Sequence, residues 1–144
     1  MAPAGFQILK DYQTAWLTNL GYDPLPIIDP GPGPDRDALD LSPASLLLLT
    51  IGPGAGLSTE GAFDRPSVQV RAIGEQSDYA SAEKLAFDVD TGFVLLDHSQ
   101  SVGGRWFLSM VRSGGGPALL LKDDADRYHF TCNYIYETEA RLNA

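Results

Sequence analysis

The sequence predicts an α+β fold: a single two-layer domain with a mostly antiparallel sheet of about five strands packed by two helices. Two segments repeat apolar residues at helical spacing, and several others alternate apolar and polar residues as strands do. Most of the strand-like segments follow one another through short turns. With 144 residues, 1–144 has the length of one domain, and we expect a Pro/Gly-rich connection at 22–45 and a loop at 53–65.

Residues 5–20 are the first predicted helix, with Gly21 as the residue that follows its end. The apolar residues at helical spacing are Ile8, Leu9, Tyr12, Trp16, Leu17 and Leu20. Five prolines between residues 24 and 34 exclude a helix or a central strand there, because proline lacks the backbone donor. A short edge strand is expected at 35–41. The continuous apolar run Leu46–Ile51 predicts a strand covered on both faces.

The central unit of the chain is a strand followed by a helix, between Arg65 and Leu96. Pro66 is expected to begin the strand, since proline does not sit inside a central strand, and Gly74 ends it. Ser77 or Asp78 is the expected helix cap. The helix buries an apolar stripe and turns its polar residues, Asp90 included, mostly away from it. The stripe consists of Tyr79, Ala82, Ala86, Val89, Phe93 and Leu96.

The C-terminal part is expected to consist of strands and turns. Residues 98–104 form a turn, and a strand over 106–111 carries Trp106, Leu108 and Met110 on one face and Phe107, Ser109 and Val111 on the other. Residues 118–136 are an antiparallel hairpin. Its last strand has Tyr128, Phe130, Cys132, Tyr134 and Tyr136 on the apolar face and Arg127, His129, Thr131, Asn133 and Ile135 on the other. The tail from 137 to 144 is expected to be frayed or briefly helical.

Charge and cysteine content narrow the class of protein. Nineteen acidic residues against ten Lys and Arg give a net charge of −9, which argues against tight nucleic-acid binding. Cys132 is the single cysteine, so no internal disulfide or multi-cysteine metal site is expected. No apolar run reaches the length of a membrane span and no secretory signal pattern begins the sequence, so we expect the cytoplasm of the cell that makes it.

No constellation of catalytic, cofactor-binding or metal-binding residues is predicted, and we expect that the protein is not an enzyme. Asp97, His98 and Ser99 are adjacent, whereas a catalytic triad joins separated segments, so a solvated turn is favoured. The acidic cluster at 123–126 lacks the Ca²⁺-loop pattern and is typical of a turn. His129 is interpreted as part of an exposed cross-strand polar pair, and Cys132 as a buried inert thiol.

Two motifs resemble those of the tail terminator (minor capsid) proteins of tailed bacteriophages. The first is Arg65-Pro66-Ser67-Val68-Gln69-Val70-Arg71 followed by Tyr79-Ala80-Ser81-Ala82-Glu83. The second runs from Arg112-Ser113-Gly114-Gly115-Gly116-Pro117 through Lys122-Asp123-Asp124 to Arg127-Tyr128-His129-Phe130-Thr131-Cys132-Asn133-Tyr134. The glycine that usually precedes the arginine of the second motif is Asp126 here, and Ala72-Ile73-Gly74 stands where an Arg-Gly often closes the first strand.

The resemblance implies a non-catalytic virion subunit without a cofactor, made in the host cytoplasm. Such a subunit forms a homohexameric ring that caps the tail tube and joins it to the head, with tail-tube and head–tail connector proteins as its partners. DNA is expected to pass through the ring without tight binding, along a negatively charged wall. Arg65, Arg71 and Arg112 are candidate subunit contacts, because arginine is enriched in interfaces. Another neck or head-completion protein, or a ligand-binding or enzymatic α+β domain, remain the alternatives.

Overall fold

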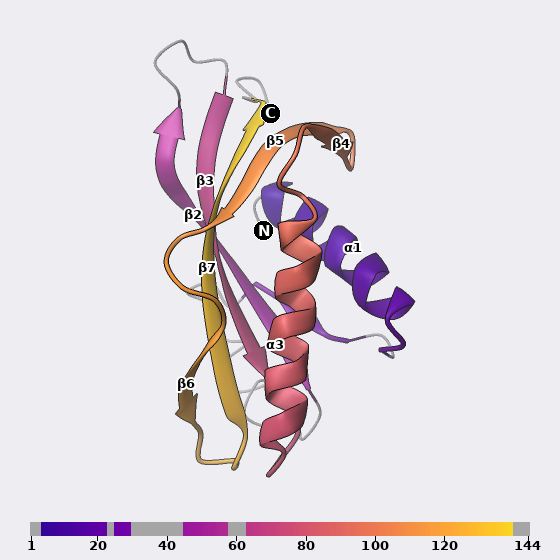
Figure 1. The fold of residues 1–144 in the computed structure, drawn as a ribbon, viewed down its shortest axis with the longest axis vertical. Helices are drawn as coiled ribbons and strands as arrows, with labels where there is room; N and C mark the ends of the chain where they lie inside the picture. Colours follow the sequence, from indigo (N-terminus) through magenta and orange to yellow (C-terminus); the bar gives the residue numbers. More distant parts are fainter. Residues whose placement is uncertain (1–3, 23–24, 30–44, 58–62, 140–144) are drawn as a thin grey trace.

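A computed structural model describes residues 4–22, 25–29, 45–57 and 63–139. It has a mixed α+β fold in which two helices lie on one side of a curled, mostly antiparallel sheet (Figure 1). The helices are α1 (Ala4–Asn19) and α3 (Tyr79–Val94). The strands are β1 (Ile27–Ile28), β2 (Leu46–Leu57), β3 (Phe63–Ile73), β4 (Gln100–Val102), β5 (Arg105–Arg112), β6 (Ala118–Lys122) and β7 (Tyr128–Glu139). Neither helix in these ranges is long and apolar enough to span a membrane.

The sheet has seven strands, two more than predicted, in the order β1-β2-β3-β7-β5-β4, with β6 also paired to β7. Only the pair β1–β2 is parallel. On one side β7 pairs with β3, whereas its other side is shared between β6 near Tyr128 and β5 near Tyr136. β5 ends opposite Tyr134 and β6 begins opposite Thr131, so residues 113–117 bridge only a short gap near the middle of β7.

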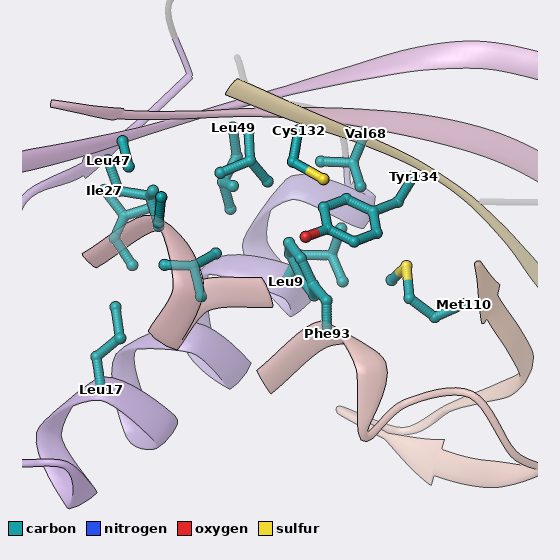
Figure 2. Close-up of a cluster of buried hydrophobic side chains, with 14 of the residues drawn as sticks. Leu9, Leu17, Ile27, Leu47, Leu49, Val68, Phe93, Met110, Cys132 and Tyr134 are labelled. Carbon is teal, nitrogen blue, oxygen red and sulfur yellow. The ribbon is translucent and has the colours of Figure 1, made fainter. Parts of the chain in front are cut away.

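The main core lies between the sheet and the helices (Figure 2). Alternate residues of the long strands β2, β3 and β7 point into it, including Leu47 and Leu49 of β2 and the predicted apolar face of β7. On the opposite face Leu46, Leu48 and Ile73 form a second buried cluster. Burial of Leu46–Leu49 on both faces confirms the prediction from the continuous apolar run.

Both predicted helices are confirmed within one or two residues. Asp78 is the cap of α3, because its side chain accepts a hydrogen bond from the main-chain N of Ser81. The predicted stripe of α3 is buried except for Tyr79, which is 43% exposed. Asp90 was expected mostly outside the stripe, but it is buried because it faces polar partners on the sheet. Gly21 adopts a φ of 94° just after α1, as a helix-ending glycine does.

The predicted loop at 53–65 is wrong at both ends. β2 continues to Leu57 and β3 already begins at Phe63, so these strands form a long arm; residues 58–62 lie outside the described ranges. A bulge between Gly52 and Gly56 absorbs the Gly/Pro-rich stretch within β2. Pro66 lies inside β3 rather than at its start, and the ladders to β2 and β7 both skip it. An interior proline is tolerated where the pairing is already interrupted.

Three further expectations for the C-terminal part need correction. The predicted turn at 98–104 contains β4, and the turn itself is only Gly103 and Gly104, which have φ values of 58° and 78°. Positive φ at both residues is what a two-residue hairpin turn requires. In β5, Phe107 and Met110 are both buried, because an irregularity between Phe107 and Ser109 shifts the alternation. The predicted frayed tail still belongs to β7 as far as Glu139.

Within its described residues, the connection at 22–45 contains β1, which was not predicted. β1 lies at the edge of the sheet, pairing Ile27 with Leu47 and Ile28 with Leu48. An edge position is compatible with the surrounding prolines, since only one side of the strand needs hydrogen-bond donors. The edge strand expected at 35–41 lies outside the described residues.

Candidate assembly surface

The residues of the two sequence motifs come together around the start of α3. The ring of Tyr79 contacts Tyr128 and Phe130 edge-on, with centroid distances of 5.1 and 5.3 Å. A Cβ atom added at Gly74 would lie 2.5 Å from the Cβ of Ala82, so β3 can approach α3 this closely only without a side chain there. The motifs therefore build the joint between strand, helix and last hairpin.

The turn between β6 and β7 is fastened to the loop before α3. Ser77 and Asp126 are the non-glycine residues with positive φ in the described chain, at 58° and 65°. The main-chain N of Ser77 donates to the main-chain O of Asp126 at 2.7 Å, and its hydroxyl donates to the Asp126 carboxylate. The Lys122 ammonium lies 2.6 Å from the same carboxylate, and its hydrogen bond lowers the pKa of Asp126.

His129 is buried, which corrects the expectation that it lies on an exposed face. Its Nε2 is 2.7 Å from Oδ2 of Asp123, which folds back from the preceding turn over the strand. Asp123 also accepts hydrogen bonds from the main-chain N and Nε of Arg127 and from the main-chain N of Ala125. Nδ1 of His129 is buried without a hydrogen bond. Burial tends to raise the pKa of Asp123, but these partners lower it on balance.

Asp90, Arg112 and Tyr134 form a polar cluster between α3 and the sheet. Arg112 donates to both carboxylate oxygens of Asp90, from Nε at 2.9 Å and Nη2 at 2.5 Å, and the hydroxyl of Tyr134 donates at 2.6 Å. Burial works against the charge on Asp90, yet these hydrogen bonds lower its pKa. Burial, followed by the bond to Asp90, raises the pKa of Tyr134. An acidic residue beside the apolar stripe of a helix was the sequence signal for this cluster.

The three arginines chosen from the sequence are not brought into one cluster. Arg112 is held by Asp90 on the helix side of the sheet, although its side chain is still 42% exposed. Arg65 and Arg71 are half-buried and lie six residues apart on β3, or about 20 Å along an extended strand. Arg71 alternates with Val70 and Ala72 of the core, and therefore lies on the sheet face opposite the helices, beside the buried Leu48.

The other residues considered for chemistry are separated by the fold. Asp97 accepts a hydrogen bond from the main-chain N of Met110, while the ring of exposed His98 lies 3.2 Å from Nε2 of Gln100. The turn at 97–99 is exposed, as predicted. Cys132 is buried and donates to the main-chain O of Gly115 at 3.7 Å, and burial raises the pKa of its thiol. This thiol has the environment of a packing residue.

Large apolar side chains are exposed on several elements, including β6 and α3. All five residues of β6 are exposed, including Leu119, Leu120 and Leu121 at 49, 44 and 41%. On α3, Phe87 and Val94 are 48 and 46% exposed on the side turned away from the core. Exposed apolar side chains on an edge strand and on a helix favour contacts with another protein. We therefore treat β6 and the outer side of α3 as the candidate assembly surface.

The fold, but not the sequence, matches known proteins. No protein-family model and no characterised protein matches the sequence, whereas ten solved chains match the fold. One is a chain in the virion of a native gene transfer agent (GTA) particle, with a TM-score of 0.53 and 15% identity over 79% of this chain and 78% of that one. A second chain, without a functional description, has a TM-score of 0.56 and 14% identity over 99% of this chain and 100% of its own. At such identities the likeness shows a shared fold.

Proposed function

We propose that this chain is a structural virion protein of a tailed phage, and specifically the ring-forming tail terminator that caps the tail tube and joins it to the head. The observation that carries the proposal is the shared fold with a chain of a GTA virion over 79% of this chain. The motif resemblance adds support, because the motif residues form one connected joint of β3, α3 and β7.

A subunit of a ring needs surfaces for its neighbours rather than a reactive centre. The exposed leucines of β6 and the exposed side of α3 are suited to that work. The prominent polar clusters, around Asp90 and Asp123, hold elements of this chain together. We therefore propose a non-catalytic role in the virion, with copies of this chain, the tail-tube protein and the head–tail connector as partners.

DNA would pass through the ring, and the net charge of −9 affects how strongly the DNA would interact with the wall of the ring. Phosphates are repelled by an acidic wall, so DNA would slide without the counterion release that drives tight binding. The proposal requires that the purified chain retains no duplex DNA at physiological salt.

The test is assembly with the tail-tube protein of the same phage. Negative-stain images of the chain with tubes should show a ring at one end of each tube, and a phage without this gene should make tails of abnormal length that fail to join heads. Normal tails joined to heads in that phage would contradict the proposal. Binding to the head-side connector but not to tubes would indicate another neck protein instead.

A further inference from the structure

One edge of the sheet carries a long exposed segment without charge (Figure 1). Residues 113–121 contain no charged side chain, and all of them except Pro117 are exposed. The segment ends in β6, where Leu119, Leu120 and Leu121 are 49, 44 and 41% exposed. Charged residues make up 20% of the sequence, so an uncharged, exposed segment of this length indicates a surface for another protein.

The main chain of β6 requires a strand as its partner. β6 pairs with β7 along one edge, and in the described residues no strand or hydrogen bond covers its other edge. Unpaired main-chain donors and acceptors at a sheet edge are best satisfied by a further extended strand. β5, which lies on the same side of β7, is better protected, because Asp97 accepts a hydrogen bond from the main-chain N of Met110 and β4 pairs with its first residues.

The two ends of the uncharged segment carry opposite charges. The turn at 123–126 is acidic, and in the described chain its exposed Asp124 has no hydrogen bond or ion pair. At the other end, Arg112 uses Nε and Nη2 to bind Asp90, and its guanidinium also lies beside Gly116, where an added Cβ atom would be 3.8 Å from Cζ. Nη1 of Arg112 is left to a ligand from outside, since the side chain is 42% exposed.

We propose that β6 pairs antiparallel with β6 of a second copy, with the two-fold axis near Leu120. This arrangement packs Leu120 against its counterpart and places the acidic turn of each copy beside Gly116 and Arg112 of the other. A parallel arrangement would bring the two acidic turns together, so the charges select the antiparallel one. The absence of acidic side chains from 113–121 also lets two chains of net charge −9 approach here with the least repulsion.

The contact is small and goes beyond the proposed function. A two-fold contact is complete with two copies, so it describes the free chain rather than a ring. β6 is short and has an irregularity between Leu119 and Leu121, and both features weaken pairing at an edge. We therefore expect dimers that form at high protein concentration and separate on dilution.

Cysteine cross-linking tests the pairing in the purified full chain, because the single native cysteine, Cys132, is buried. Leu120→Cys should give a disulfide-linked dimer under mild oxidation, since the two thiols meet at the axis. Ala118→Cys and Lys122→Cys should each stay unlinked, because the two copies of either residue lie about 13 Å apart along the strands, whereas a mixture of these two variants should link. Phe87→Cys, exposed to a similar degree on α3, is the matched control and should not link.

Charge variants test the orientation of the two copies by sedimentation. Asp124→Lys should weaken dimerisation about tenfold, because it places a lysine beside Arg112 of the second copy. Glu83→Lys makes the same change of net charge on α3 and should leave dimerisation unchanged or slightly stronger, since the chain becomes less negative. Leu120→Lys should abolish dimerisation, because two lysines would meet at the axis. Circular dichroism verifies that each variant is folded.

Three results would overturn the pairing: a wild type that stays monomeric at its highest soluble concentration, Leu120→Cys that links no faster than Phe87→Cys, or Ala118→Cys that links as well alone as in the mixture. Linkage of Leu120→Cys to added tail-tube protein, and not to itself, would assign β6 to that partner and overturn the pairing too. The dimer is measured without tubes, so ring formation on tubes tests the proposed function separately.

Discussion

Asp126 shows how one substitution within a recognisable pattern is accommodated. The residue has a φ of 65°, where glycine is least strained, and glycine usually occupies this place in the motif that the sequence resembles. Aspartate tolerates the left-handed region better than most side chains. Here it also gains contacts with Ser77 and Lys122 that glycine could not make. The backbone strain and the new contacts therefore oppose each other at one position.

Two variants separate these effects at Asp126. Asp126→Ala removes both contacts and keeps the backbone strain, whereas Asp126→Gly removes the contacts and relieves the strain. We expect the alanine variant to have a melting temperature several degrees below that of the wild type, and the glycine variant to lie above the alanine variant. Thermal unfolding followed by circular dichroism measures the order. Equal melting temperatures for the two variants would contradict a strained backbone.

The Asp90 carboxylate is expected to stabilise the fold through its buried hydrogen bonds. Asp90→Asn should lower the free energy of unfolding by about 2 kcal/mol. This loss is smaller than the usual cost of breaking a buried ion pair, because the Arg112 side chain stays partly in water. Tyr134→Phe removes only a hydroxyl and should cost about 1 kcal/mol. Urea denaturation measures both. Because the two residues share a hydrogen bond of 2.6 Å, the double variant should lose less than the sum of the single losses.

At the scale of elements, the packing of α1 on α3 depends on a glycine. The side chains of Tyr12, Gln13 and Trp16 donate hydrogen bonds to main-chain carbonyls of α3. A Cβ atom on Gly92 would lie 2.6 Å from Cδ1 of Trp16. The close approach of the two helices thus requires a residue that lowers helix propensity.

Gly92→Ala should destabilise the protein although alanine is the better helix former. The gain in propensity is about 1 kcal/mol, whereas displacing Trp16 from a packed contact costs roughly 1–3 kcal/mol and breaks its hydrogen bond to the main-chain O of Asp88. Thr91→Ala, at the exposed neighbouring position, is the matched control and should change the free energy of unfolding by less than about 0.5 kcal/mol. A Gly92→Ala protein more stable than the wild type in urea would show that the helices can move apart freely.

Elements with a long, regular apolar repeat could be predicted from the sequence, whereas short or irregular elements could not. Both helices and β7 were found because their apolar residues repeat over many positions, and such patterns survive small local errors. β4 and the extension of β2 were missed, since three residues give no period and Gly/Pro-rich segments normally end a strand. The irregularity in β5 puts Phe107 and Met110 on the same face, although a regular alternation assigns them to opposite faces. His129 looked exposed because period two assigns a face to a residue but cannot show that Asp123 folds over it.

At the scale of the whole molecule, acid sensitivity follows from the carboxylates. The folded state lowers the pKa of Asp90, Asp123 and Asp126. A lowered pKa means that the folded protein binds fewer protons than the unfolded chain. Its stabilising effect is complete above the unfolded value of about 3.9 and is lost as pH falls through the folded values. Unfolding should therefore become easier below about pH 4, with little change between pH 5 and 7 from these groups.

The acid effect can be assigned by comparing the wild type with Asp90→Asn in urea at pH 7, 4 and 3, at low protein concentration. The variant has lost one of the three carboxylates, so its free energy of unfolding should fall less steeply with acid. The two proteins should converge as Asp90 becomes protonated in the wild type. Parallel pH profiles would mean that Asp90 titrates alike in the folded and unfolded chain, and the stabilising role given to Arg112 and Tyr134 would then be wrong. Convergence would show that the charge on this one carboxylate holds α3 to the sheet.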